Sequence, residues 1–414
     1  MASIEKRGEN SYRLTVSCGY DNNAKQILKR RTINLSNIKP IKQLEEAQKQ
    51  FVLFENEIKK GMYVDNEKIT FEGFVEKWLS DYANVNLQPK TLFEYKKLLT
   101  RINAALGHIK LIHLQPTHLT EFYNNLREDG IRKDGKPGGL SEKTILHHHR
   151  LISTILNTAL QWGFILTNPA LRVTAPKVKK QEARHYNVEE TAYILELLDN
   201  EALKYKTMIT LAIYGGMREG ELTALTWNDI DFNNCVINID KSLQHLPDKG
   251  TFIKSTKTEN SRKISITKSV ISLLREYKLW QNGVKTDLGN LWIDKNMIFT
   301  AENGDYIFPS TISKWFLKFI RKHNKAITND ISIPEDDKRN YMLHEVNFHG
   351  LRHTSATLLI NQNTDISTVS KRLGHARTST TMDIYSHALQ KADQTASDKL
   401  DNLFNKKVQN KKQG

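Results

Sequence analysis

The sequence predicts a multidomain, mainly α-helical protein with small β-sheets. Its 414 residues are too many for one domain of roughly 150 residues. Apolar residues recur every three or four positions through much of the first half, and short alternating segments occur near the N-terminus and in the second half. We expect a small β-sheet with one helix (residues 1–62), a four-helix domain (68–172), a linker (173–184) and a mixed α+β domain (185–414).

The composition indicates a partner that carries many negative charges. Lysine and arginine number 61 against 46 acidic residues, which gives a net charge of +15. Two cysteines cannot form a disulfide framework or a four-thiolate metal site. No apolar run approaches the ~20 residues of a membrane span, and the N-terminal residues lack the apolar core of a signal peptide. We therefore expect a cytoplasmic protein that binds nucleic acid and does not associate with membranes.

The N-terminal residues alternate as a strand does. The positions expected on its apolar face are Tyr12, Leu14, Val16, Cys18 and Tyr20. A second strand is expected over 26–35, and a helix after Pro40. The apolar stripe of that helix is Leu44, Ala47, Phe51, Phe54 and Ile58. The basic residues of this sheet are Arg13, Lys29, Arg30 and Arg31. Two interpretations remain open: a solvated charged sheet, or a surface that contacts DNA.

The next hundred residues read as four amphipathic helices. The second of them begins after Pro89, and the last is capped by Ser141 and runs to Trp162. The segment 174–184 has Pro176 and no apolar periodicity, which is typical of an extended linker. At the far end of the chain, apolar residues three and four apart predict a further helix over 391–409.

Six residues of the second half form a set whose members are individually weak signals. A lone tyrosine is most often a core residue, and His147-x-x-Arg150 shows how easily a His-x-x-Arg pattern arises by chance. The set, in chain order, is Arg218, Lys257, His349, Arg352, His375 and Tyr385.

Together these side chains suit transesterification at phosphorus. Two arginines can hold the non-bridging oxygens of one phosphodiester through planar, multidentate donors. A lysine can protonate a leaving hydroxyl, and histidines can donate to phosphate oxygens or transfer the nucleophile's proton. A tyrosine hydroxyl, with an ordinary pKa near ~10, becomes a usable nucleophile where cations stabilise its anion. No metal-ligand spacing or nucleotide loop competes with this set, so we expect no cofactor and no metal.

The order Arg, Lys, His-x-x-Arg, His, Tyr resembles the tyrosine recombinase (phage integrase) family. The surrounding motifs agree: Gly-Met-Arg218-Glu-Gly-Glu221-Leu, Thr-Lys257-Thr, His349-Gly-Leu-Arg352-His-Thr, and Leu-Gly-His375 ten residues before Tyr385. Gln-Pro-Lys90-Thr91-x-x-x-Tyr95 and Thr-Asn168-Pro169-Ala resemble the start and the exit of the family's core-binding domain. The similarity spans about residues 70–390, and the combined motif is highly specific.

The resemblance implies a role for each residue. Tyr385 attacks the scissile phosphate and leaves a 3′-phosphotyrosyl bond with a free 5′-hydroxyl, while Arg218 and Arg352 hold the phosphate. Lys257 protonates the leaving oxygen, His349 acts as acid or base, and His375 supports the transition state. Glu221 orients the first arginine; the alternative is a plain surface carboxylate. Lys90, Thr91 and the basic residues of the N-terminal sheet are expected to contact DNA.

Four functions fit such a family member. The favoured one is the integrase of a prophage or conjugative transposon, in which the N-terminal arm binds separate DNA sites. A Xer-like recombinase that resolves chromosome or plasmid multimers is the main alternative. A type IB topoisomerase and a DNA-binding regulator that keeps only the fold are the others. The resemblance implies a monomer that forms a tetramer on double-stranded attachment sites, with a Holliday junction intermediate and an excisionase or DNA-bending protein as possible accessories.

Overall fold

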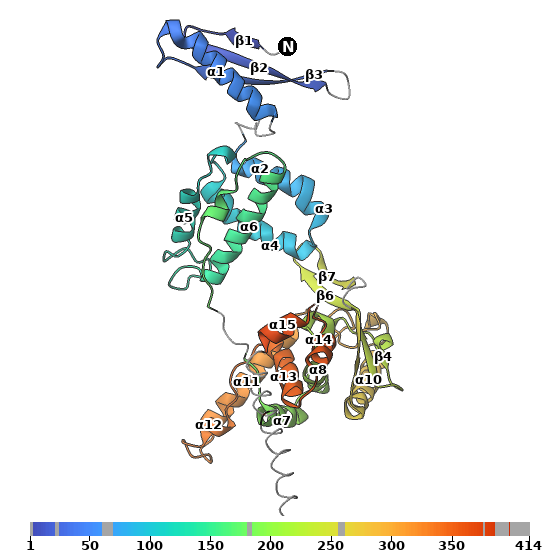
Figure 1. Cartoon of the computed structure of the whole chain (residues 1–414). Coiled ribbons are helices and arrows are strands. Elements are labelled where there is room, and N and C mark those ends of the chain that lie inside the picture. The colour runs from blue at the N-terminus through green and yellow to red at the C-terminus, as the bar shows by residue number, and fades with distance from the viewer. Residues whose placement is uncertain are drawn as a thin grey trace, which may run out of the picture. The chain divides into compact units, whose positions relative to one another are not determined.

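The computed structural model describes residues 3–20, 25–59, 69–179, 184–255, 261–375 and 377–385, together with Ser397. The chain divides into two compact units, residues 1–180 and 181–414 (Figure 1). The prediction of a mainly helical protein with small β-sheets is confirmed, and the strands of these sheets pair antiparallel. The helix predicted over 391–409 lies outside the described residues, apart from Ser397.

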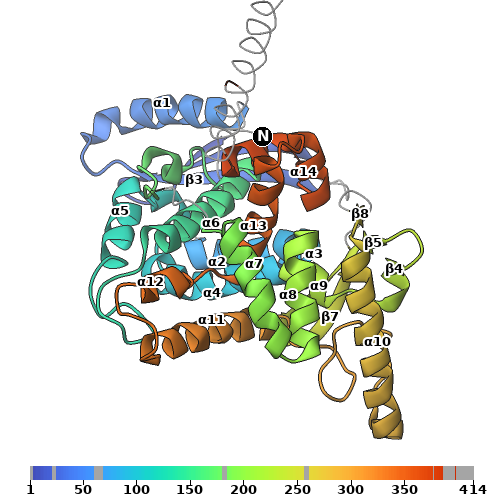
Figure 2. The ribbon, with the colours of Figure 1, turned by 90° about the horizontal axis from the view of Figure 1, so that it is seen from below.

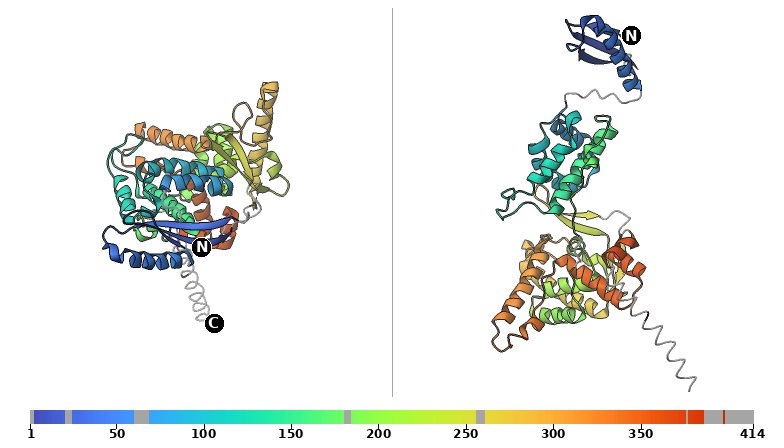
Figure 3. Two further views of the ribbon diagram at one scale, coloured as in Figure 1. Left: turned by 90° about the horizontal axis from the view of Figure 1, so that it is seen from above. Right: turned by 60° about the vertical axis from the view of Figure 1, so that its left-hand side comes forward.

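The N-terminal part is a three-stranded antiparallel sheet with one helix across it (Figure 1, Figure 3). Its elements are β1 (Ser3–Lys6), β2 (Ser11–Tyr20), β3 (Gln26–Asn34) and α1 (Pro40–Lys59). Strand β2 lies in the centre, and its buried Leu14 and Val16 pack against Phe54 of α1. Both predicted strands and the helix are confirmed, whereas β1 was not predicted.

Three residues of this part that were expected on apolar faces, Leu44, Cys18 and Tyr20, are exposed. Leu44 is 55% exposed, and the preceding Gln43 is buried in its place. The Gln43 amide donates hydrogen bonds to Asn10 Oδ1 and to the carbonyl oxygens of Leu35 and Ile38, so a polar residue satisfies this turn. Cys18 is exposed and not a core thiol, because the β2–β3 register shifts between Ser17 and Tyr20 and the alternation of faces is lost there.

The rest of the first unit is the predicted four-helix domain. Its helices are α2 (Phe71–Trp78), which continues through a π-helical segment (Leu79–Ala83) into α3 (Asn84–Asn86), then α4 (Pro89–Leu106), α5 (Pro116–Asn125) and α6 (Glu142–Gln161). The predicted cap is confirmed, because Ser141 Oγ accepts a hydrogen bond from the Thr144 N–H. Phe71, Phe74 and Trp78 of α2 are fully buried and meet Ile152 and Ile155 of α6 in a core of this domain's own.

The second unit contains short strands and nine α-helices among its described residues. The helices are α7 (Val188–Leu197), α8 (Leu203–Gly215), α9 (Glu219–Thr223), α10 (Lys268–Leu288), α11 (Thr311–Asn329), α12 (Lys338–Tyr341), α13 (Phe348–Asn361), α14 (Ile366–Leu373) and α15 (Thr378–Ile384). The strands are β4 (Ile230–Asp231), β5 (Val236–Ile239), β6 (Lys241–Leu246), β7 (Gly250–Ser255) and β8 (Arg262–Ser265). Strands β4, β5 and β8 form one antiparallel sheet, with α10 beside it (Figure 2), and β6 pairs with β7 as a hairpin.

Helix α8 organises the core of this unit. It is buried nearly all round, from Thr207 to Gly215, which explains why its sequence is apolar without an amphipathic period. Helices α13, α10 and α9 pack against it. Arg218 lies directly before α9 and Arg352 lies on α13. Because both helices contact α8, this helix fixes the two arginines relative to each other. None of the helices in the described part of the chain is long and apolar enough to cross a membrane.

Candidate active site

The turn after α8 positions the first arginine. Gly216 caps α8 in the left-handed conformation with φ of 58°, and an added Cβ would lie 2.7 Å from Leu373 Cδ2. Met217 is buried, and Arg218 then becomes the N-cap residue of α9. The Gly-Gly-Met-Arg sequence therefore makes a tight turn that leaves the Arg218 side chain 42% exposed.

Glu221 links two arginines and is not a surface carboxylate, since it is only 4% exposed. It accepts hydrogen bonds from the backbone N–H and Nη1 of Arg218, at 2.9 and 2.7 Å, and from Nη2 and Nη1 of Arg262, at 2.7 and 3.1 Å. Burial alone would raise the pKa of Glu221, but the hydrogen bonds and charges of Arg262 and Arg218 lower this pKa to about 2.

Arg352, on α13, is a buried cation with spare hydrogen-bonding capacity. It is 2% exposed, and its Nη1 donates to the carbonyl oxygen of Gly216 at 2.8 Å. Its Nη2 has no hydrogen-bond partner among the described residues. Burial, followed by the charge of Arg218, lowers the pKa of Arg352 to about 9, so the guanidinium stays protonated at neutral pH. A buried donor without a partner costs about 1–3 kcal/mol, which an anionic ligand would recover.

Two histidines of α13 lie one turn apart on the same side as the tyrosine. The rings of His349 and His353 have centroids 4.9 Å apart and are nearly perpendicular. His353 Nδ1 lies 2.9 Å from Tyr385 Oη, and the two atoms share a hydrogen bond. Burial and the nearby cationic groups lower the pKa of His353 to about 4, so its imidazole is neutral at pH 7.

The turn after α14 resembles the turn after α8. Gly374 again has the left-handed conformation, with φ of 68°, and its carbonyl oxygen accepts a hydrogen bond from Arg218 Nη2 at 3.3 Å. His375 follows, and its Nδ1 shares a hydrogen bond of 2.8 Å with Oγ1 of the fully buried Thr381. Burial and the charges of Arg352 and Arg218 lower the pKa of His375 to about 4.

Tyr385 closes the site at the end of α15. It is 5% exposed and packs with Ala356, Ile360 and Leu373. Its backbone N–H donates to the carbonyl oxygen of Thr381 at 3.0 Å. Burial raises the pKa of Tyr385 to about 12 against the opposing effect of the Arg352 charge. The hydroxyl is therefore protonated, and an acceptor for its proton is required before the oxygen can attack.

The structure brings together most of the predicted site. Arg218, Glu221, His349, Arg352, His375 and Tyr385 converge from the α8–α9 turn, α13 and the α14–α15 segment. Lys257 lies in the segment 256–260, outside the described residues.

Two further residues belong to the site and were not predicted, Arg262 and His353. Arg262 shares a strand face with the buried Ile264, and an inward-facing arginine requires a carboxylate partner. His353 is four residues after His349 and therefore on the same helix face. Both signals were present in the sequence.

The predicted DNA-contacting residues lie on different surfaces. In the sheet, Arg13 and Arg30 are paired with Thr32 and Thr15, on the face away from α1. Lys29 and Arg31 are paired with Val16 and Leu14, on the face that α1 covers. The Arg31 guanidinium lies over the Phe54 ring, 4.6 Å from its centroid.

In the helical domain, Lys90 and Thr91 lie in the first turn of α4. Lys90 is exposed, and Thr91 is half-buried.

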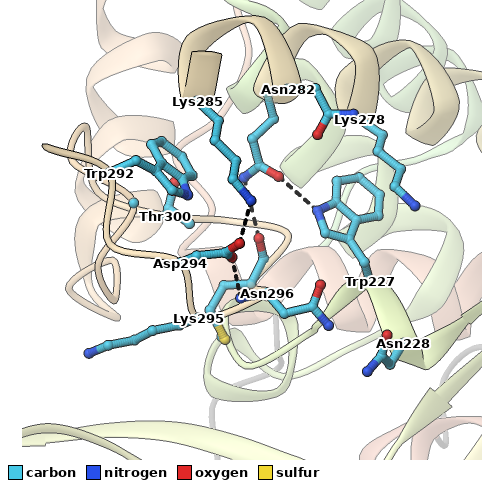
Figure 4. A pocket seen from close by; sticks show the side chains of 13 residues that line it. Trp227, Asn228, Lys278, Asn282, Lys285, Trp292, Asp294, Lys295, Asn296 and Thr300 are labelled. Atoms are coloured by element: carbon cyan, nitrogen blue, oxygen red, sulfur yellow. Dashed lines mark hydrogen bonds and ion pairs between the residues drawn. The ribbon is translucent and has the colours of Figure 1, made fainter. Parts of the chain in front are cut away.

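A separate cavity of about 190 Å³ lies between α10 and residues 292–304 (Figure 4). Two of the three lysines that line it are in ion pairs, Lys285 with Asp294 and Lys295 with Asp305, and the third, Lys278, lies over the rings of Trp227 and Phe232. None of the predicted catalytic residues that the structure describes lines this cavity. Its charges therefore give no reason to place a phosphate there.

The model of the phage integrase family matches residues 185–392, which is half of the chain and includes all six predicted catalytic positions. The chain belongs to the phage integrase family. A second model, the N-terminal SAM-like domain of phage integrases, matches residues 70–127 of this integrase. The sequence resemblance and its assignment as a tyrosine recombinase, an enzyme that cuts and rejoins DNA, are thereby confirmed.

Relatives match the integrase over nearly its whole length. A tyrosine recombinase XerC-like protein of Caldanaerobacter subterraneus is 28% identical over 96% of this chain and 98% of its own. The ICEBs1 integrase of Bacillus subtilis is 26% identical over 97% of this chain and 100% of its own. A solved structure of the Tn1549 transposon integrase with circular intermediate DNA has a TM-score of 0.64 at 21% identity, and it covers 80% of this chain and 100% of its own.

Proposed function

We propose that this chain is the site-specific integrase of a mobile genetic element, such as a conjugative transposon or prophage, and that it acts on DNA in the bacterial cytoplasm. The relatives that include the ICEBs1 integrase and an integrase of Staphylococcus phage L54a support this assignment. The observation that carries this proposal is the arrangement around Arg352: a buried guanidinium with one donor that has no partner among the described residues, beside a second arginine and a buried tyrosine hydroxyl.

The proposed reaction is a transesterification that conserves the phosphodiester. Tyr385 Oη forms a bond to phosphorus as the bond from phosphorus to the 5′-oxygen breaks, and the leaving oxygen takes a proton that we assign to Lys257. Arg352 and Arg218 bind the non-bridging oxygens and stabilise the charge that develops on them. His375, fixed by Thr381, is oriented to donate to the same phosphate. Religation reverses these steps without ATP.

We further propose that monomers assemble as a tetramer on two crossover sites and exchange strands through a Holliday junction. The +15 charge suits a protein that covers long stretches of duplex. The N-terminal sheet would contact separate arm sites with Arg13 and Arg30. An excisionase or a DNA-bending protein would set the direction of exchange.

The decisive experiment replaces the nucleophile. Tyr385→Phe removes one oxygen and keeps the ring that packs on Ile360 and Leu373, so folding and DNA binding should persist. The substrate is a duplex with the element's own crossover site, nicked so that the cleaved fragment diffuses away. Wild type should accumulate a covalent complex on denaturing gels, and the variant none. A covalent complex with the variant would place the nucleophile elsewhere.

One observation favours a second function. The XerC-like relative aligns over 96% of this chain, which leaves the resolution of chromosome or plasmid multimers as the alternative. Recombination in vitro between the element's two ends and a host target would support the integrase. Recombination only between two identical sites would support the multimer-resolving function.

A further inference from the structure

The hydrogen bond of the nucleophile goes to a histidine outside the predicted catalytic set. Tyr385 Oη shares its bond with Nδ1 of His353, at 2.9 Å. His349, to which the resemblance assigns the acid–base role, has its ring centroid 4.9 Å from that of His353 and makes no hydrogen bond among the described residues. His353 is thus the imidazole that touches the reacting oxygen.

The surroundings of His353 hold its ring in this position. The residue lies on α13 directly after the buried Arg352, whose Nη1 is bonded to Gly216. The tyrosine ring lies 5.6 Å from the imidazole, centroid to centroid, and is only 5% exposed. In this buried contact a histidine with its proton on Nε2 offers Nδ1 as the acceptor for the hydroxyl proton.

We infer that His353 is a catalytic residue that accepts the Tyr385 hydroxyl proton during DNA cleavage and returns it during religation. This inference rests on the proposed function, since it needs Tyr385 to be the nucleophile. As the bond from Oη to phosphorus forms and the bond to the 5′-oxygen breaks, the phenolic proton moves to Nδ1 and His353 becomes an imidazolium. When the 5′-hydroxyl attacks the phosphotyrosine, the proton returns to the departing Oη.

Bound DNA makes His353 a stronger base. In the free protein, burial lowers its pKa first, and the charges of His349, Arg352, His185 and His375 add to this effect. A phosphodiester held by the arginines places a negative charge among these groups. That charge opposes the cations and raises the affinity of the imidazole for a proton, so the acceptor becomes effective when substrate is present.

The test measures single-turnover formation of the covalent complex on two nicked substrates. One has the normal 5′-oxygen at the scissile bond. The other has sulfur there, which leaves as a thiolate and needs no proton. His353→Asn keeps a hydrogen-bonding group near the position of Nδ1 but cannot take up a proton. His323→Asn, the matched control, changes a histidine of α11 that bonds to the Tyr341 carbonyl oxygen.

We expect His353→Asn to slow cleavage by about 100-fold or more on both substrates, the usual range for a lost acid–base catalyst. Lys257→Ala should be slow with oxygen and restored with sulfur, and His323→Asn should match wild type. Cleavage by His353→Asn within about threefold of wild type, well below the range of a lost acid–base catalyst, would overturn the inference. Rescue of His353→Asn by sulfur would also overturn it, because the histidine would then act on the leaving group.

A gel shift on intact crossover DNA verifies that the variant is folded. If the variant does not bind DNA, the pH dependence of the wild-type protein tests the inference. The logarithm of its cleavage rate on the sulfur substrate should fall with a slope of one as the pH is lowered, because the acceptor becomes protonated. A rate independent of pH would overturn the inference. Absence of any covalent complex from wild type would instead refute the proposed function.

Discussion

At the scale of single residues, the two arginines of the site differ in how their charge is balanced. Arg218 shares Glu221 with Arg262, whereas Arg352 makes its hydrogen bond to a backbone carbonyl oxygen. The carboxylate therefore fixes Arg218 in place, whereas Nη2 of Arg352 has no partner in the part of the chain that the structure describes. This division suits a site in which one cation is positioned before DNA binds and the other is satisfied by the phosphate.

Glu221→Gln tests how much the Glu221 carboxylate contributes to the stability of the folded protein. It leaves Arg262, itself nearly buried, without a carboxylate, and breaking a buried ion pair costs about 3 kcal/mol. The pKa of Glu221 is lowered from its ordinary value of 4.5 to about 2 in the folded protein. Its stabilising contribution is therefore complete above pH 4.5 and is lost as the pH falls through about 2.

Urea unfolding at pH 7 and below pH 4.5 measures this difference. The difference in free energy of unfolding between wild type and Glu221→Gln should be largest at pH 7 and should decrease as the pH is lowered. Glu345→Gln serves as the control, because its ion pair with Arg321 is on the surface and should contribute little. Equal stability of Glu221→Gln and wild type at pH 7 would exclude a structural role.

Motif order predicted most of the residues that converge at the site but missed Arg262 and His353, and it did not predict which contacts the residues make. Arg218, Arg352 and Tyr385 come from segments more than 30 residues apart, and only the family resemblance joined them. The bond from His353 to Tyr385 depends on where α15 returns to α13, which no local pattern encodes. The pairing of Arg262 with Glu221 likewise joins a strand to a helix 41 residues earlier.

At the scale of elements, α15 connects His375 to Tyr385, the proposed nucleophile. Thr381 contacts both: its hydroxyl bonds to His375 and its carbonyl oxygen accepts the Tyr385 N–H. Because Thr381 is fully buried, its hydroxyl makes this bond out of contact with solvent. A shift of α15 would therefore move the nucleophile and release the histidine together.

Thr381→Val should remove the hydrogen bond to His375 and keep the backbone hydrogen bond to Tyr385. Valine has nearly the shape of threonine, so α15 should fold and Tyr385 should stay in place, while the His375 ring loses its partner. Loss of one hydrogen bond of about 1 kcal/mol predicts a roughly fivefold slower cleavage step. Single-turnover rates on the nicked substrate provide the measurement, and Thr381→Ser should restore the rate. An unchanged rate for the valine variant would show that His375 is oriented by other contacts.

Apolar periodicity predicted the helices and strands that bury one face. It placed single residues wrongly where the alternation of buried and exposed positions is interrupted. The helices of the four-helix domain and the paired strands β2 and β3 followed their apolar patterns. Cys18 was misplaced because a register shift ends the alternation, and Leu44 because the buried Gln43 takes its position. The short β1 has too few residues for an alternating pattern to be recognised.

At the scale of the whole molecule, each part of the chain has a hydrophobic core of its own, so we expect each part to fold without the others. The N-terminal sheet and α1 pack around Leu14, Val16 and Phe54, and the helical domain packs around its own buried aromatics. The site described above uses residues of the second unit alone. Removal of residues 1–62 should therefore leave a folded protein that still cleaves a crossover site.

The last prediction concerns what the N-terminal sheet contributes to DNA binding. Each phosphate contact adds about −0.9 to the slope of log K against log salt concentration, so Arg13→Ala with Arg30→Ala should flatten that slope by about two units. Lys29→Ala with Arg31→Ala changes the same charge on the face that α1 covers, where Arg31 packs on Phe54, and should mainly destabilise the domain. Binding is measured on DNA that carries the element's whole end, with thermal unfolding in parallel. Equal slopes for both pairs would mean that the sheet contributes only nonspecific charge, and no change in slope for either would exclude it from the DNA interface.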